Sequence, residues 1–124
     1  MPHIIIEHSD NFDSNFTKNL ILEVHHTLQN SEGNFDINAC KGRAVAYQNY
    51  LLGNNEAGRD FIHITLKIHT GRSKEIRINL AKIISEKIKL KLENYKKTEG
   101  LKNKTDFTIS INEIDSDIYQ KSII

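Results

Sequence analysis

The residue best suited to chemistry in this 124-residue chain is Pro2, the only proline, which follows the initiator methionine directly. A small second residue allows removal of the methionine, which would leave Pro2 as a free secondary amine. A terminal amine titrates near ~8 in water, and an apolar setting lowers that pKa toward neutrality by disfavouring the charged form. General bases work best near the operating pH. Pro2 is therefore a candidate base; the alternative is a start-of-chain residue that only resists proteolysis.

The histidines of the chain do not predict a metal site. His25 and His26 are adjacent on an expected helix and diverge by about 100°. His63 and His69 share a strand face but lie about 20 Å apart at the rise of a strand. Because no acidic or cysteine partner repeats at ligand spacing, we expect no metal. His3, next to Pro2, could orient the amine or a substrate, or could be structural.

Composition describes one ordinary globular domain, residues 1–124, with 38% hydrophobic and 27% charged residues. The net charge of +1 gives no global argument for nucleic acid, membrane or strongly acidic partners. The second expected helix is rich in lysine, but glutamates lie between the lysines. This pattern indicates a solvent-exposed helix face and not a surface that binds the phosphates of a nucleic acid. A single cysteine, Cys40, excludes an internal disulfide and is expected to serve packing. With no leader pattern and no long apolar segment, the expected location is cytoplasmic.

The elements that must position Pro2 follow from hydrophobic periodicity. A strand is expected over 2–8. A helix is expected to follow, with Asp13 or Ser14 as its N-cap and a glycine-containing C-terminal cap in residues 31–34. A second strand is expected over 37–47, and 53–58 reads as a hairpin or loop tip. The sequence therefore predicts a first β-α-β unit over 2–50.

The second half repeats that order. The pattern predicts a strand over 59–70, a helix that begins after Ser73 and ends at Glu99-Gly100, and a last strand over 107–112. The tail, 116–124, shows no clear pattern but is unusually apolar for a solvated end. The sequence therefore predicts a second β-α-β unit over 58–115.

Two β-α-β units predict an α/β (α+β) fold, in which a four-stranded mixed sheet carries both helices on one face. Strands joined through a helix pair in parallel by a right-handed crossover. The opposite face then has nothing in the chain to cover it. Phe61, His63 and Thr65 are expected there, so some apolar surface remains for a neighbouring subunit. Self-association is expected.

Two stretches of the chain resemble a known family. Pro2-His3-Ile4-Ile5-Ile6-Glu7, followed by Ser9-Asp10-Asn11, is similar to the opening of 5-carboxymethyl-2-hydroxymuconate isomerases. Phe61-Ile62-His63 and Thr65-Leu66-Lys67-Ile68, followed by Gly71-Arg72-Ser73 and Arg77, resemble the strand-to-helix junction of the same family. These enzymes belong to the tautomerase superfamily, whose fold is a pair of β-α-β units arranged as a trimer. The resemblance covers most of the chain.

The resemblance implies an isomerase that moves a proton along a conjugated enol carboxylic acid in aromatic-compound catabolism. The Pro2 amine would take a proton from the dienol and return it to a distant carbon, which gives the unsaturated ketone. The resemblance further implies a small-molecule substrate with several carboxylates, no cofactor, and a homotrimeric assembly. The alternative is a non-catalytic, tautomerase-like trimeric module that binds or supports other molecules.

The resemblance also assigns the cations that would hold those carboxylates. Arg72 matches the family's junction arginine, next to helix amides that could assist in holding an anion. The family's second strand usually has arginine on both sides of one residue, and those positions fall on Gly42 and Ala44, with Arg43 between them. A one-residue offset sends a strand side chain to the other face. Either a bulge restores Arg43 to the site or the site lacks one cation, for which Lys41 could substitute.

Overall fold

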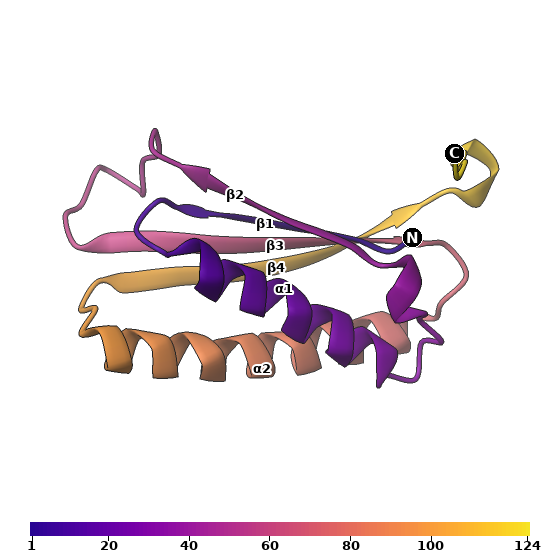
Figure 1. Ribbon diagram of the computed structural model, residues 1–124, viewed down its shortest axis with the longest axis horizontal. Coiled ribbons are helices and arrows are strands. Elements are labelled where there is room, and N and C mark those ends of the chain that lie inside the picture. The colour runs from indigo at the N-terminus through magenta and orange to yellow at the C-terminus, as the bar shows by residue number, and fades with distance from the viewer.

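The computed structural model describes residues 1–124 as one four-stranded sheet with two long helices on the same face (Figure 1). This confirms the predicted fold. Two short 3-10 helices, η1 (Ile37–Ala39) and η2 (Ser116–Ile118), flank the second and last strands. The main elements are β1 (His3–Ser9), α1 (Ser14–Gln29), β2 (Lys41–Tyr47), β3 (Arg59–His69), α2 (Lys74–Glu99) and β4 (Lys104–Ile114).

The strand order in the sheet is β2-β1-β3-β4. β1 pairs in parallel with β2, and β3 pairs in parallel with β4, while β1 and β3 are antiparallel. Each parallel pair is joined through one helix, as a β-α-β unit requires. Of the two predictions for 53–58, the hairpin is wrong, because β1 lies between β2 and β3, and the loop is correct. That segment is a loop that crosses one end of the sheet.

Strand alternation and one stripe on each helix build the core. Even-numbered residues of β1 and β3 point toward the helices and are fully buried, as Ile6 and Ile64 are. The helices contribute residues three or four apart, such as Leu20 on α1 and Ile84 on α2. Phe16 and Tyr95 stack with their ring centroids 3.8 Å apart, which joins the two helices.

The helix ends agree with the predicted caps except at the end of α1. Asp13 accepts a hydrogen bond from the Phe16 amide at 2.8 Å, and Ser73 caps α2 in the same way. Gly100 ends α2 in the left-handed region, at φ 66°. The prediction that a glycine-containing cap ends α1 is wrong. The C-cap is Asn30, and the residue in the left-handed region is Asn34, at φ 57°.

The second and last expected strands have different bounds in the structure. Residues 37–39 form η1 instead of strand, because the Asp36 side chain accepts from the Asn38 amide at 2.9 Å and caps a tight turn. β2 therefore begins at Lys41. The last strand is longer than expected, since β4 pairs with all eleven residues of β3.

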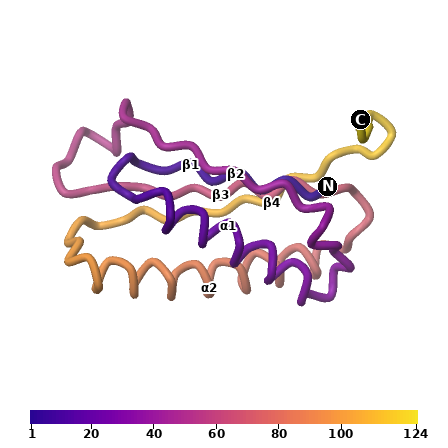
Figure 2. Tube along the Cα trace, viewed as in Figure 1, coloured from indigo at the N-terminus to yellow at the C-terminus, as the bar shows by residue number.

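The face of the sheet opposite the helices, here named the open face, is covered by no long helix or further strand, and only the C-terminal segment lies against one end of it (Figure 1). It carries the odd-numbered residues of β1, β2 and β3 and the even-numbered residues of β4 up to Asn112. Both termini lie at one end of the sheet, where the C-terminal segment turns back above the N-terminus (Figure 2). This end, the amino-terminal end of β1, is the place to look for a site built on Pro2.

Candidate functional site

Pro2 is buried at the amino-terminal end of β1, where backbone hydrogen bonds to η1 and β2 hold the start of the chain. Its carbonyl oxygen accepts a hydrogen bond from the Lys41 amide at 3.0 Å, which continues the β1–β2 ladder by one residue. The Met1 amine donates to the Ala39 carbonyl at 3.1 Å. A proline at this position needs no partner for an N–H group. The chain terminus is therefore held in one place against η1.

The surroundings of the terminus favour an uncharged amine. Burial, followed by the hydrogen bond and the charge of the Lys41 side chain, lowers the pKa of the Met1 amine from 8.0 to about 6. Lys121 of the C-terminal segment acts in the same direction. While Met1 is present, the Pro2 nitrogen is part of an amide and is not basic. Removal of Met1 would transfer the free amine to Pro2 beside the same cations.

Arg43 lies on the open face next to His3, and no bulge is needed to bring it there. The β1–β2 register runs unbroken from His3↔Lys41 to Ser9↔Tyr47. Gly42 and Ala44, on the opposite side of the strand, face the helices. One terminal nitrogen of Arg43, Nη1, lies 3.1 Å from His3 Nδ1. Simple alternation along a regular strand therefore places this arginine beside the residue that follows Pro2.

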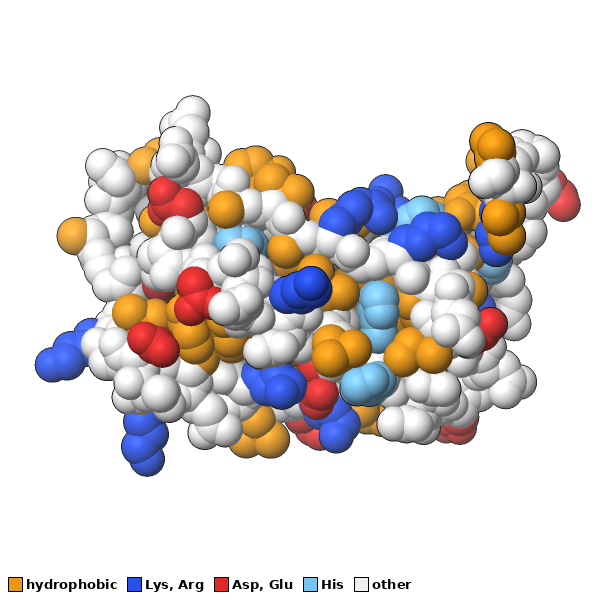
Figure 3. All heavy atoms as spheres, in the orientation of Figure 1, with side chains coloured by type: hydrophobic (Ala, Val, Ile, Leu, Met, Phe, Trp, Pro, Cys, Tyr) orange, Lys and Arg blue, Asp and Glu red, His pale blue; other side chains and the backbone are white.

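Two lysines add positive charge to the same end of the open face. Lys41 precedes Arg43 by two residues, and Lys67 on β3 is the register partner of His3. Together with Arg43 and the terminal amine they lower the pKa of His3, although burial is the largest cause. Lysine, arginine and histidine side chains gather there on the surface, beside the C-terminal segment (Figure 3). The arrangement is suited to holding an anion with more than one carboxylate.

Arg72 lies just before α2 at the same end of the sheet, but its contacts are with the loop that follows α1. Its Nε donates to the Gly33 carbonyl at 2.8 Å, and its guanidinium carbon lies 3.9 Å from the centre of the Phe35 ring. Burial lowers its pKa from the ordinary value. The structure brings it into no contact with Pro2, His3 or Arg43. Its two terminal nitrogens make no hydrogen bond within the chain.

Tyr119 is the residue of this cluster that sequence reasoning missed. Its hydroxyl lies 2.9 Å from His3 Nε2, and its ring meets the His69 ring edge-on at 5.1 Å between centroids. The apolar character of 116–124 was the only signal in the sequence. That signal indicated that the tail packs against another surface, but it did not identify His3 and His69 as the residues contacted. Lys67 continues the alternation of Phe61, His63 and Thr65, so the sequence indicates its strand face but not its partner.

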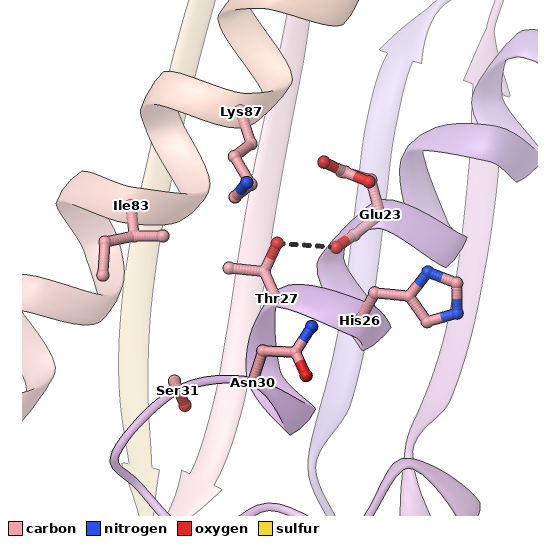
Figure 4. Close-up of a pocket in the computed structure, with 7 residues that line it drawn as sticks. All are labelled: Glu23, His26, Thr27, Asn30, Ser31, Ile83 and Lys87. Atoms are coloured by element: carbon pink, nitrogen blue, oxygen red, sulfur yellow. Dashed lines mark hydrogen bonds between the residues drawn. The ribbon is translucent and has the colours of Figure 1, made fainter.

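Other features of the surface stand apart from this cluster. Arg77, which shares the family resemblance, forms an ion pair with Glu113 at 3.1 Å. A polar pocket lies between the two helices and is lined by Lys87 of α2 and by Glu23 and Thr27 of α1 (Figure 4). The Thr27 hydroxyl donates to the Glu23 carbonyl. No helix has the length and apolarity needed to cross a bilayer. No group of three or more potential metal ligands comes together anywhere in the structure.

The chain matches one family model over nearly its whole length. That model describes 5-carboxymethyl-2-hydroxymuconate isomerase and covers residues 2–123. No curated protein matches the sequence.

Several solved structures share the fold. A 5-carboxymethyl-2-hydroxymuconate isomerase from Deinococcus radiodurans R1 has a TM-score of 0.80 at 21% identity, with 98% of this chain and 88% of that chain covered. A 5-carboxymethyl-2-hydroxymuconate delta-isomerase has a TM-score of 0.79 at 15% identity, with 99% and 88% covered. A fused 4-OT asymmetric trimer has a TM-score of 0.73 at 12% identity, with 96% and 91% covered. At these identities the likeness shows a common fold.

Proposed function

This chain belongs to the 5-carboxymethyl-2-hydroxymuconate isomerase family and is an isomerase of the tautomerase type, and on that premise we propose its substrate and its base. The substrate is an unsaturated 2-hydroxy carboxylic acid, and 5-carboxymethyl-2-hydroxymuconate is the first choice. The base is the amine of Pro2 after removal of Met1. The observation that carries this proposal is the position of Pro2, which is buried at the start of β1 directly after a terminal amine whose pKa is lowered by burial and then by nearby lysines.

In the proposed reaction the proton moves within one substrate molecule. The neutral amine of Pro2 takes the proton from the 2-hydroxyl group of the dienol. The resulting ammonium then returns that proton to a distant carbon, and the product is the unsaturated ketone. A base with a pKa near neutrality can perform both halves of this transfer. The step requires no cofactor, because the bonding electrons stay within the conjugated substrate.

The substrate carboxylates would be held by the cations on the open face. Arg43 offers a planar fork that matches a carboxylate, and Lys41 and Lys67 offer point charges nearby. Arg72 remains a proposed ligand for a second carboxylate, because its terminal nitrogens are unpaired. His3, between Pro2 and Arg43, would contact or orient the substrate. This set of cations supports a di- or tricarboxylate over a monocarboxylate.

We further propose a cytoplasmic homotrimer that acts in aromatic-compound degradation. The fused 4-OT structure that shares this fold is a trimer. The open face and the exposed edge of β2 give a neighbouring copy of the chain two surfaces to cover. Strand β2 and the apolar tail are the expected contributors at the subunit boundary. One site per subunit would then lie near that boundary.

Substitution of Pro2 tests the base. Pro2→Ala should lower the rate of enol-to-ketone isomerisation by about 10²–10⁴-fold, the usual contribution of a positioned base. Mass spectrometry of the same preparations should show that Met1 is absent from the active wild-type protein. The alanine amine could serve in part, so the lower end of this range is still a positive result. Full activity with Met1 retained would defeat the proposal.

A further inference from the structure

The C-terminal segment is anchored to the proposed site through one side chain, Tyr119. After β4 the chain forms η2 and turns back over the amino-terminal end of β1 (Figure 2). Ile118 and Ile124 are exposed, whereas Tyr119 is partly buried between His69 and His3. The Ser116 hydroxyl lies 3.1 Å from His69 Nδ1 and adds a second point of attachment. The segment therefore brings a phenol to the residue next to Pro2.

The direction of the hydrogen bonds at His3 follows from Arg43. A guanidinium has donors only, so His3 Nδ1 at 3.1 Å from Arg43 must be the acceptor and carries no proton. The proton of the neutral ring then sits on Nε2, which donates to the Tyr119 hydroxyl oxygen at 2.9 Å. Burial and the surrounding cations lower the pKa of His3, which agrees with a neutral ring. The tautomer is thus fixed by its neighbour.

This chain of bonds leaves the phenolic hydrogen of Tyr119 available. The hydroxyl oxygen accepts from His3, and the hydroxyl makes no other hydrogen bond within the protein. Donation from His3 also polarises the phenol and makes it a better donor. A phenol whose oxygen is held by His3, whose hydrogen has no partner in the chain and which lies next to a group of cations is suited to stabilising a negative oxygen.

We propose that Tyr119 is a catalytic residue, which donates its hydroxyl hydrogen to the substrate oxygen that changes from enol to ketone, and that His3 positions it. This inference rests on the proposed function. As the Pro2 amine removes the 2-hydroxyl proton, negative charge develops on that oxygen, and the hydrogen bond from Tyr119 stabilises it. The phenol keeps its proton throughout. The proton on Pro2 goes to the distant carbon, so the substrate and product remain isomers.

Removal of one hydroxyl tests Tyr119. Tyr119→Phe keeps the ring that packs on His69, so the fold should be retained. Its kcat should fall by about 10²–10³-fold, the usual loss for one oxyanion donor, with little change in KM. The control is Tyr47→Phe, because Tyr47 is a half-exposed tyrosine at the other end of the open face, where it donates to Glu7 at 2.7 Å. An unchanged kcat in Tyr119→Phe would overturn the catalytic role.

The positioning role of His3 has a readout that does not depend on catalysis. Nitrogen NMR of the His3 ring at pH 7 should show a neutral ring with the proton on Nε2, and Tyr119→Phe should shift the Nε2 signal. A proton on Nδ1 would overturn the arrangement. In kinetics, His3→Gln keeps a donor of similar reach and should retain more kcat than His3→Ala. Equal losses in both variants, with equal losses in stability, would reduce His3 to a structural residue.

These outcomes separate the failure of this inference from the failure of the proposed function. A wild-type protein that isomerises enol acids, with Tyr119→Phe equally active, would remove only the role of Tyr119. A wild-type protein with Met1 removed that isomerises no enol acid would remove the proposed function and the catalytic role of Tyr119 with it. The His3 tautomer would in that case still report whether the hydrogen bonds from Arg43 through His3 to Tyr119 exist.

Discussion

At the scale of single residues, the proposed site depends on where each cation lies and what already occupies its hydrogen-bonding groups. Arg43 is engaged with His3 through one terminal nitrogen and is otherwise free on the open face. Arg72 is engaged through Nε and is supported by the Phe35 ring, which fixes the plane of its fork. The two arginines therefore differ in rigidity. Arg72 is preorganised, and Arg43 is tied to the histidine that contacts Tyr119.

Both arginines are expected to distinguish substrates by carboxylate number. Arg43→Ala and Arg72→Ala should each raise KM for a di- or tricarboxylate enol acid by about ten- to a hundredfold, as expected for roughly 1.5–3 kcal/mol from a charged hydrogen bond. The effect on a monocarboxylate such as an aryl enolpyruvate should be smaller, because the remaining cations suffice for one carboxylate. Steady-state kinetics on a panel of enol acids measures the difference.

The control for both variants is Arg59→Ala, because Arg59 pairs with Asp106 at the other end of the sheet. Equal losses on every substrate would mean that an arginine acts in the transition state or in folding instead of in carboxylate recognition.

At the scale of elements, the position of β2 depends on how closely α1 can approach it. Gly42 faces the helix, and a Cβ atom built there would lie 2.2 Å from Ile21 Cγ2 and 2.7 Å from His25 Nε2. Real side chains do not approach that closely, so a side chain at this position would force Ile21 and His25 to move. His25 Nε2 is buried without a hydrogen-bond partner. Tight packing on this side keeps β2 in register, and the register in turn places Arg43.

Enlarging Gly42 should therefore harm both stability and activity. Gly42→Ala is expected to lower the free energy of unfolding by about 1–3 kcal/mol, the usual cost of overpacking. Ala46→Val, on an exposed position of the same strand, should change it by less than about 0.5 kcal/mol. Urea denaturation of the two variants measures both values. A Gly42→Ala protein as stable as wild type would show that α1 moves away from β2 without cost.

At the scale of the whole molecule, helices cover only one face of the sheet. The helices bury the even-numbered residues of β1 and β3, but the open face leaves Ile5 and Phe61 half-buried and Val45 44% exposed. The chain also leaves β2 as an exposed edge strand. Apolar side chains next to an unpaired edge are typical of a surface that another copy covers.

The protein is expected to be a trimer of the 14.3 kDa chain at micromolar concentration. Light scattering should give about three times the chain mass. Ile5→Glu should shift the population toward monomer, because Ile5 lies centrally on the open face and charged residues are depleted at interface cores. Lys87→Glu changes a charge on the helical side and should leave the mass unchanged. A monomer in the wild-type protein would contradict the trimer.

The sequence by itself determined the type and order of the main elements and the fold class, because these depend on local patterns. The alternation of Ile62, Ile64, Leu66 and Ile68 indicated a strand with one buried face. Ser73 marked the start of the second helix, and the start of the first was narrowed to Asp13 or Ser14, of which Asp13 is the cap. Pro2 was recognisable as a candidate base because its position in the chain is itself the signal. The family resemblance added Arg72 and the direction of the chemistry.

The tertiary structure decided everything that depends on which strands are neighbours. Arg43 and Gly42 are adjacent in sequence and point to opposite faces, and only the β1–β2 register shows that the arginine meets His3. Asp36 turned part of an expected strand into η1, because a short-range cap competed with the ladder. Tyr119 lies 116 residues from His3, and no local pattern encodes a contact of that separation. Periodicity specifies the faces of an element, whereas pairing and packing specify what each face meets.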